Sequence, residues 1–243
     1  MEGFILNKRG LIITIDGPAG AGKSTIAKKL ACQLNYKYIN TGDIYRYLTY
    51  RAIVLGLDIE DDKTMDNLSF KLSCEMTQKS IRGEKWSQLV YSKKNILDLI
   101  HSPEIDKKVS IVAQHKSVRK NLVRLQRDLG REGAVVMEGR DIGSCILPEA
   151  DIKLFFTANN YTRTMRRLKE LKEKGFQVDF QEVERDIIKR DNYDSQRKIA
   201  PLKQTEDSII IDTSNQTVNG ILKKVLNIVQ SYLRRRKNEN SQS

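Results

Sequence analysis

Gly17-Pro18-Ala19-Gly20-Ala21-Gly22-Lys23-Ser24 is a glycine-rich stretch that closely follows the apolar run Leu11 to Ile15. That run is rich in β-branched residues and predicts a buried parallel strand. From Thr25 to Leu34, apolar residues recur at intervals of four, which predicts a helix. A strand, a glycine loop and a helix in this order are typical of a site for nucleotide phosphates.

Each residue type in this stretch has a physical reason to be there. Glycines let backbone N–H groups point at phosphate oxygens, because no Cβ blocks the turn. Lys23 supplies a positive charge for the outer phosphates, and the Ser24 hydroxyl can join the ligands of Mg²⁺. The alternative is a glycine turn that only begins a helix. The Lys-Ser pair and the flanking elements favour the site for a nucleoside triphosphate or a close relative.

The composition sets limits on the class of protein. The 243 residues, 30% charged and 39% apolar, suit one large α/β domain or a core domain with inserts. No apolar stretch reaches the roughly 18 residues of a membrane span, and the N-terminal apolar run is too short for a signal peptide. The three cysteines, Cys32, Cys74 and Cys145, lie far apart and fit reduced thiols. We therefore expect a cytoplasmic protein without a membrane partner.

The net charge of +12 raises the alternative of a nucleic-acid-binding protein. Much of the excess is spread over predicted helices, and part lies in Arg234-Arg235-Arg236-Lys237, which we interpret as a solvated, frayed terminus. A cleft that binds the phosphates of two nucleotides also needs basic residues. We therefore expect no nucleic-acid partner.

Predicted strands alternate with predicted helices along most of the chain. Further strands are expected at 36–40, 134–137, 151–156 and 208–211, the last one buried, and helices at 43–55, 103–129, 161–174, from 179 onward, and at 218–233. This alternation predicts a parallel sheet covered on both faces, a three-layer α/β/α fold. Residues 58–102 differ. Short alternating runs at 72–76 and 86–91, with a turn at 82–85, predict a small, mostly β insert.

Two polar segments follow predicted strands, where the carboxyl ends of a parallel sheet face a ligand crevice. Thr41 begins a helix that also carries Arg46, an arrangement suited to a second phosphate, although Thr41 is also an ordinary helix cap. Glu138 occupies a position from which an acid helps to place Mg²⁺, and the adjacent Arg140 and Asp141 can meet substrate. Taken by itself, this second segment would be only a polar loop.

Two helices carry further candidates. Arg163, Arg166 and Arg167 lie on a basic helix that can close over transferring phosphates, whereas its lysines fit a solvated face. Arg190, Asp194 and Arg197 are spaced four and three apart and share one helix face. They are either a surface ion-pair ladder or part of a sugar or phosphate pocket.

Taken in order, these segments resemble the bacterial cytidylate kinases, members of the nucleoside monophosphate kinase superfamily. The resemblance runs from about residue 11 to 230 and rests on four strings: 15–24, 41–46, Glu138-Gly139-Arg140-Asp141-Ile142-Gly143, and Arg190-Asp191 through Ala200-Pro201-Leu202. The last two strings in combination are the most specific. Three positions depart from the family pattern: Thr41 replaces a serine, Ser144 a threonine, and His101 an arginine.

The resemblance implies an enzyme that transfers the γ-phosphoryl group of ATP to CMP or dCMP with Mg²⁺, and we expect the enzyme to be a monomer. It implies a core (1–57, 103–157 and 189–243, the last with a basic tail), a monophosphate-binding insert (58–102) and a short helical lid region (158–188).

The resemblance also implies roles for individual residues. ATP would be bound by Gly17, Pro18, Ala19, Gly20, Ala21, Gly22, Lys23, Ser24, Thr25, Arg163 and Arg166, and Mg²⁺ by Ser24 and Glu138. The acceptor would be bound by Thr41, Arg46, Ser110, Arg119, Arg140, Asp141, Arg190, Asp194 and Arg197, with Ser110, Arg119 and Asp141 at the cytosine. Lys23, Arg140, Arg166 and Arg167 would take part in the transfer itself.

Other functions compete with this interpretation. A kinase of the same fold could act on AMP, UMP, shikimate or dephospho-coenzyme A, and the set formed by Ser110, Arg119 and 190–197 argues for cytidylate. A nucleotide-dependent switch of the GTPase type usually carries an Asn-Lys-x-Asp string, which this sequence lacks. A nucleic-acid-binding module is the third alternative.

Overall fold

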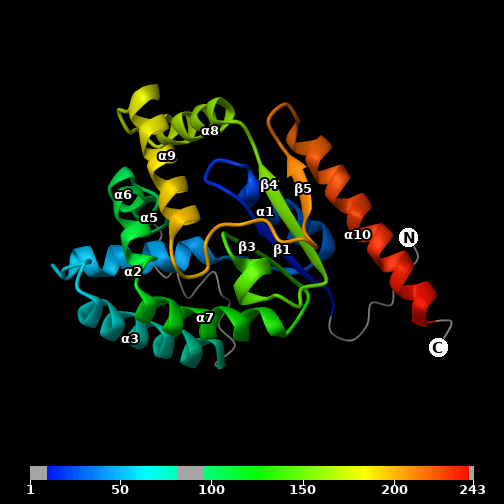
Figure 1. Ribbon diagram of the computed structural model, residues 1–243, viewed down its shortest axis with the longest axis horizontal. Coiled ribbons are helices and arrows are strands. Elements are labelled where there is room, and N and C mark those ends of the chain that lie inside the picture. The colour runs from blue at the N-terminus through cyan, green and yellow to red at the C-terminus, as the bar shows by residue number, and fades with distance from the viewer. Residues whose placement is uncertain (1–9, 82–95, 241–243) are drawn as a thin grey trace.

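Five parallel strands lie at the centre of the computed structural model, which describes residues 10–81 and 96–240 (Figure 1). Their order across the sheet is β2-β3-β1-β4-β5. The strands are β1 (Ile12–Asp16), β2 (Lys37–Asn40), β3 (Val135–Gly139), β4 (Ile152–Thr157) and β5 (Ile209–Asp212). The predicted parallel sheet is confirmed.

Helices connect these strands and form the outer layers. They are α1 (Lys23–Leu34), α2 (Thr41–Val54), α3 (Asp62–Ile81), α5 (Ile96–Ile100), α6 (Pro103–Val112), α7 (Lys116–Arg131), α8 (Asn160–Glu173), α9 (Phe180–Gln196) and α10 (Val218–Asn240), with a single π-helical turn, η1 (Ile142–Ile146). None of the helices in the described ranges combines the length and apolar character needed to span a bilayer.

The two faces of the sheet bury alternate residues of each strand. Along β1, Ile13 and Ile15 pack with α1 and α10, whereas Ile12 packs on the opposite face with η1 and the nearer side chains of α7. Successive side chains of a strand point to opposite faces, so a continuous apolar run supplies both layers. The expected three-layer α/β/α architecture is thus present.

A second apolar core lies beside the sheet, among α2, α3, α6 and α7 (Figure 1). It corrects the mostly β insert predicted for residues 58–102, because the described part of that segment is helical. The run 72–76, read from the sequence as a strand, lies inside α3. Met65, Leu68, Leu72 and Met76 are all buried and are spaced three, four and four, which is a helical period. The predicted turn at 82–85 and strand at 86–91 fall outside the described residues.

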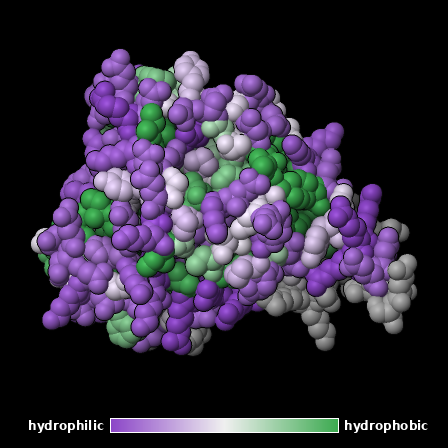
Figure 2. Space-filling view, in the orientation of Figure 1, coloured by the Kyte–Doolittle hydropathy of each residue, from purple (hydrophilic) through white to green (hydrophobic). Residues whose placement is uncertain are grey.

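Two smaller expectations were also wrong. The last strand was expected to be buried, but Ile209 and Ile210 of β5 are 42% and 49% exposed because β5 is the edge strand. Figure 2 shows hydrophobic side chains gathered over β5 and the adjoining part of α10. The run 234–237 was expected to fray, but it continues α10 to Asn240, and Arg236 bonds Asp151 at 3.2 Å.

The parallel arrangement brings the carboxyl ends of three strands to one edge of the sheet. Asp16 at the end of β1 lies opposite Gly139 of β3, and Asn40 of β2 lies opposite Glu138. The glycine loop, the start of α2 and the loop that begins at Arg140 therefore meet at this edge, as the sequence predicted.

Candidate active site

The glycine loop is a turn that only glycine fits at its key positions. Gly17 has a φ of +145°, and a Cβ there would lie 2.1 Å from the Phe156 carbonyl oxygen. Gly20 has a φ of +74°, and its Cβ would lie 2.9 Å from Cβ of Arg163. The loop is thus pressed between β4 and α8 and ends at the N-terminus of α1, where backbone N–H groups favour anions.

Lys23 lies inside this loop and is buried, with Nζ donating to the Pro18 carbonyl at 2.7 Å. Burial lowers the pKa of Lys23, and the positive charges of Arg140 and Arg190 lower it further, while the Glu138 carboxylate opposes them. The lysine therefore lies near two further positive charges, which an anionic ligand would offset.

Glu138, at the end of β3, connects three segments of the edge. The Ser24 hydroxyl donates to its Oε2 at 2.9 Å, and the Tyr38 hydroxyl donates to Oε1. The Thr41 hydroxyl donates to the Glu138 carbonyl at 2.8 Å. Burial raises the pKa of the Glu138 carboxyl, and Lys23 opposes that rise.

Ser24 and Glu138 fit the expected Mg²⁺. Both present oxygen donors, the ligands this hard cation prefers, and Mg²⁺ usually takes one or two protein carboxylates with substrate phosphates rather than a protein cage. No group of three or more His, Cys, Asp or Glu suited to a metal occurs in the described part of the chain.

A cavity of about 380 Å³ joins the loop to the expected acceptor side. Lys23 and Ser24 line it together with Arg46 of α2, Arg140 after β3 and Arg190 of α9. Arg167 and the buried Ser110 also line it. Of the three arginines predicted to bind the acceptor phosphate, Arg46 and Arg140 line this space with the glycine loop, whereas Arg197 does not.

Behind these arginines lies a network of buried charges. Arg140 Nε donates to Asp194 at 2.8 Å, and Arg197 lies 3.9 Å from Asp194 and 3.2 Å from Asp141. Asp141 also accepts from Arg119. Burial raises the pKa of Asp194, but Arg140, Arg190 and Arg197 outweigh it, so that this pKa lies below its usual value. Arg119, Asp141 and Arg197 are not among the described residues that line the cavity.

Of the three predicted lid arginines, two contact the glycine loop and one contacts the segment around His101. Arg163 donates to the Ala19 carbonyl at 3.2 Å, and Arg166 donates to the Gly20 carbonyl at 3.3 Å and to the Thr213 carbonyl at 2.6 Å. Arg167, from the same helix, donates instead to the His101 carbonyl at 3.1 Å.

Comparison with known proteins agrees with this arrangement. The family model described as cytidylate kinase matches residues 13–231. This chain belongs to the cytidylate kinase family.

Curated relatives align over nearly all of their length. A cytidylate kinase from Alkaliphilus oremlandii is 45% identical over 218 residues, which cover 90% of this chain and 97% of that protein. One from Exiguobacterium sp. is 41% identical, covering 92% of this chain and 98% of the relative, and one from Bacillus cytotoxicus is 38% identical, covering 95% and 100%.

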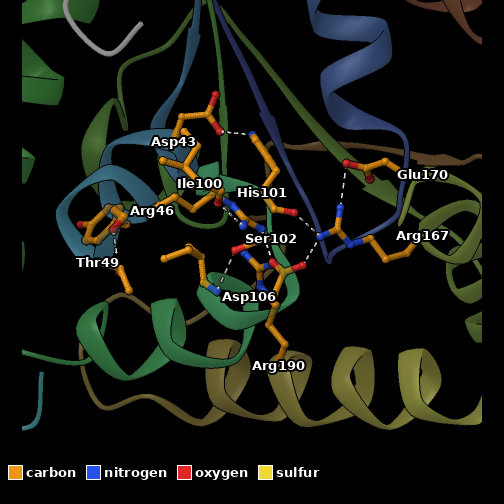
Figure 3. A network of polar contacts seen from close by, with 12 residues as sticks. Asp43, Arg46, Thr49, Ile100, His101, Ser102, Asp106, Arg167, Glu170 and Arg190 are labelled. Atoms are coloured by element: carbon orange, nitrogen blue, oxygen red, sulfur yellow. Dashed lines mark hydrogen bonds and ion pairs between the residues drawn. The ribbon is translucent and has the colours of Figure 1, made fainter. Parts of the chain in front are cut away.

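The structure adds residues that the sequence reasoning missed in this member of the cytidylate kinase family. Asp106 of α6 contacts Arg46, Arg167 and Arg190 (Figure 3). Its position four residues before Ser110 on the same helix was the available signal, since residues four apart share a helix face. His101, noted only as a departure from the family pattern, lies 3.0 Å from Asp43 through Nε2 (Figure 3).

Asp16 was also missed. It accepts hydrogen bonds from the backbone N–H groups of Ile142 (2.9 Å) and Gly143 (2.7 Å) and so ties the end of β1 to the turn after Asp141. Burial raises the pKa of Asp16 to about 6. The two backbone donors that Asp16 bonds are not revealed by the sequence.

Proposed function

We propose that the protein transfers the γ-phosphoryl group of ATP to CMP or dCMP, giving ADP and the cytidine diphosphate. The observation that supports this most directly is the single cavity lined both by Lys23 and Ser24 of the glycine loop and by Arg46, Arg140 and Arg190. A phosphoryl transfer needs its donor and acceptor phosphates in line within one enclosed space. Membership of the cytidylate kinase family supports the choice of acceptor.

The glycine loop is the proposed site for the donor. Its backbone N–H groups and Lys23 would bind the triphosphate, with Arg163 and Arg166 held against the same loop by their bonds to Ala19 and Gly20. Thr25, exposed at the start of α1, would adjoin the phosphates. Mg²⁺, held by Ser24 with Glu138 nearby, would supply neutralisation of phosphate charge.

The other end of the cavity, together with the network of buried charges beside it, is the proposed acceptor site. Arg46, Arg140 and Arg197 would bind the acceptor phosphate, with Arg197 acting close to Asp194. Arg190 and Asp194 would contact the ribose, and Thr41 would support Glu138 beside it. Ser110, whose buried hydroxyl lacks a hydrogen-bond partner among the described residues, would bond the cytosine together with Arg119 and Asp141.

The reaction asks for position and charge rather than a covalent intermediate. Lys23, Arg140, Arg166 and Arg167 would stabilise the negative charge on the transferring group, since fixed positive charges lower the barrier most where charge develops. Closure of the lid helices would exclude water and so suppress hydrolysis of ATP.

Replacement of Lys23 by alanine tests the proposal. ATP-dependent CDP formation should fall by about 100-fold or more, because a buried phosphate-binding charge is lost. Lys29→Ala, which removes an exposed lysine of the same helix, is the matched control and should retain activity. A panel of CMP, dCMP, UMP and AMP identifies the acceptor. CDP formation by Lys23→Ala at the wild-type rate, or a preference for AMP, would contradict the assignment.

A cytoplasmic location and a monomeric state are part of the same proposal. They are checked by cell fractionation and by sedimentation of the purified protein.

A further inference from the structure

Asp106 receives guanidinium groups from three separate helices. Arg46 comes from α2, Arg167 from α8 and Arg190 from α9, and each bonds the Asp106 carboxylate (Figure 3). Arg190 and Arg46 share Oδ1, with the Arg190 contact at 2.9 Å, while Arg167 takes Oδ2. One carboxylate thus stands where three arginines from distant parts of the chain converge.

This cluster is largely removed from solvent. The Asp106 side chain is 15% exposed, and those of Arg46, Arg167 and Arg190 are similarly or more deeply buried. Three positive charges this close repel one another and lose hydration, so a buried anion among them is needed to hold them together. Burial raises the pKa of Asp106, but the three arginines lower it well below its usual value, so the carboxylate is charged.

We propose that the Asp106 carboxylate is an internal substitute for the acceptor phosphate: it holds Arg46, Arg167 and Arg190 together before the acceptor binds, and the incoming phosphate competes with it for them. The identity of the acceptor as a nucleoside monophosphate rests on the proposed function. The competition between a carboxylate and a phosphate for these arginines does not.

The positions of the arginines support this exchange. All three line the cavity that also contains Lys23, so an anion that enters it meets the same guanidinium groups that Asp106 bonds. Arg190 Nε is buried and lacks a hydrogen-bond partner among the described residues, which leaves a donor for a further acceptor oxygen. A phosphate dianion has more charge and more acceptor oxygens than a carboxylate, so it can displace Asp106.

Exchange of Asp106 for phosphate would free Arg167 from one of its two carboxylate partners. Its neighbours Arg163 and Arg166 bond the glycine loop, whereas Arg167 is directed to the acceptor side by Asp106 and by Glu170 at 2.7 Å. Displacement of Asp106 would remove one of these two carboxylates. Asp106 is thus a positioning residue, which acts through Arg167 rather than on the reacting atoms.

Binding of inorganic phosphate alone, measured by calorimetry at fixed ionic strength, tests the proposal without any turnover. Asp106→Asn removes the competing charge and should bind phosphate about tenfold more tightly than the wild type. Asp106→Glu keeps the charge and should bind phosphate as the wild type does. Equal phosphate affinity in Asp106→Asn and the wild type would overturn the proposal.

Thermal unfolding provides a second measurement. Asp106→Asn should unfold at a lower temperature than the wild type in chloride, and phosphate should restore more of its stability than it adds to the wild type. Asp151→Asn is the matched control. Asp151 is 19% exposed, bonds Arg236 and lies outside the cavity, so phosphate should not rescue its loss. The proposal fails if Asp106→Asn folds neither in chloride nor in phosphate. It also fails if phosphate raises the unfolding temperature of Asp106→Asn no more than that of Asp151→Asn.

A comparison of CMP with cytidine separates this inference from the proposed function. Asp106→Asn should bind CMP more tightly than the wild type and cytidine equally well, because only CMP carries the phosphate. If Asp106→Asn gains phosphate affinity but the wild type forms no CDP, the kinase assignment is refuted and the role of Asp106 stays intact. If the wild type forms CDP but Asp106→Asn binds phosphate no more tightly than the wild type, the kinase assignment stands and the role of Asp106 is refuted.

Discussion

Asp141 pairs with two arginines: Arg197 lies 3.2 Å from its Oδ1, and Arg119 donates a hydrogen bond to its Oδ2. A carboxylate has about four lone-pair sites, so Asp141 retains the capacity to accept from the 4-amino group of cytosine. Uracil presents a carbonyl oxygen at that position, which a carboxylate repels. The side chain is thus suited to distinguish the two pyrimidines.

Asp141→Asn should therefore reduce the preference for CMP over UMP by about 100-fold, measured as the ratio of the two kcat/KM values. Asp194→Asn is the control, because Asp194 accepts a hydrogen bond from Arg140 and lies 3.9 Å from Arg197 but is not proposed to contact the base. It should lower kcat/KM for both substrates alike. An unchanged ratio in Asp141→Asn would exclude Asp141 from base recognition.

The buried Asp16 predicts a distinctive dependence of stability on pH. Burial raises its pKa from 3.8 to about 6, so between these pH values the folded state binds more protons at this site than the unfolded state. The contribution of Asp16 to the free energy of unfolding is therefore largest below pH 4 and is lost as the pH rises to 6. A difference of about two pH units corresponds to about 3 kcal/mol.

Asp16→Asn removes this titration, so its free energy of unfolding relative to the wild type should rise by up to about 3 kcal/mol from pH 4 to 6. Urea unfolding at a series of pH values measures it. Asp194→Asn should show the opposite trend, and only below about pH 4, because the pKa of Asp194 lies below its usual value of 3.8 and its contribution is lost as the pH falls through that range. Parallel curves for Asp16→Asn and the wild type would show that the carboxyl is not perturbed.

At this scale the sequence could predict residues whose role lies in a local pattern. Lys23 and Ser24 begin α1 after the glycine loop, Glu138 lies near the end of β3, and the structure brings all three to one edge of the sheet. Asp106 and Asp16 could not be assigned, because their partners lie far away in the chain or are backbone N–H groups. The spacing of Asp106 from Ser110 places the two on one helix face, but it does not identify the arginines that Asp106 contacts.

Among the elements, the glycine loop offers the sharpest test of the fold. A Cβ at Gly17 would lie 2.1 Å from a backbone oxygen of β4, which cannot move without disturbing the sheet. Gly17→Ala should therefore destabilise the protein by more than about 3 kcal/mol in urea unfolding.

Gly56→Ala is the matched control for that prediction. Gly56 also has a positive φ, +63°, but nothing lies within 4 Å of its ideal Cβ. Only the cost of the left-handed backbone remains, about 1 kcal/mol. Equal losses in the two variants would mean that the close approach to Phe156 is relieved at little cost.

Strands and helices could be predicted where the apolar residues followed a single clear pattern, either a continuous run or a helical period. The buried strands at β1 and β3 are continuous apolar runs, and α8 is preceded by a capping asparagine, Asn159, and followed by Gly175. The insert was misread because a five-residue window at 72–76 fits an alternating pattern by chance. Only the longer window from Met65 to Met76 reveals the period of a helix.

For the molecule as a whole, the excess positive charge is concentrated partly on the last turns of α10, where Arg236 bonds Asp151. Deletion of residues 234–243 should change the free energy of unfolding by less than about 1 kcal/mol, because exposed ion pairs contribute little. CDP formation should be unchanged, since residues 234–240, the described part of the deleted segment, do not line the cavity. A loss of CDP formation in the shortened protein would contradict this prediction and show that residues 234–243 are needed for activity.

The strand order has a consequence for synthesis of the protein. The central strand β1 is paired through Ile12 with Val135 and through Ile13 with Ile152, so both of its neighbours are translated long after it. Until residue 157 of 243 has left the ribosome, this apolar segment has no complete pair of partners for its backbone N–H and C=O groups. A nascent chain of this topology therefore carries an aggregation-prone segment for more than half of its translation, and it depends on chaperones or on rapid completion to protect it.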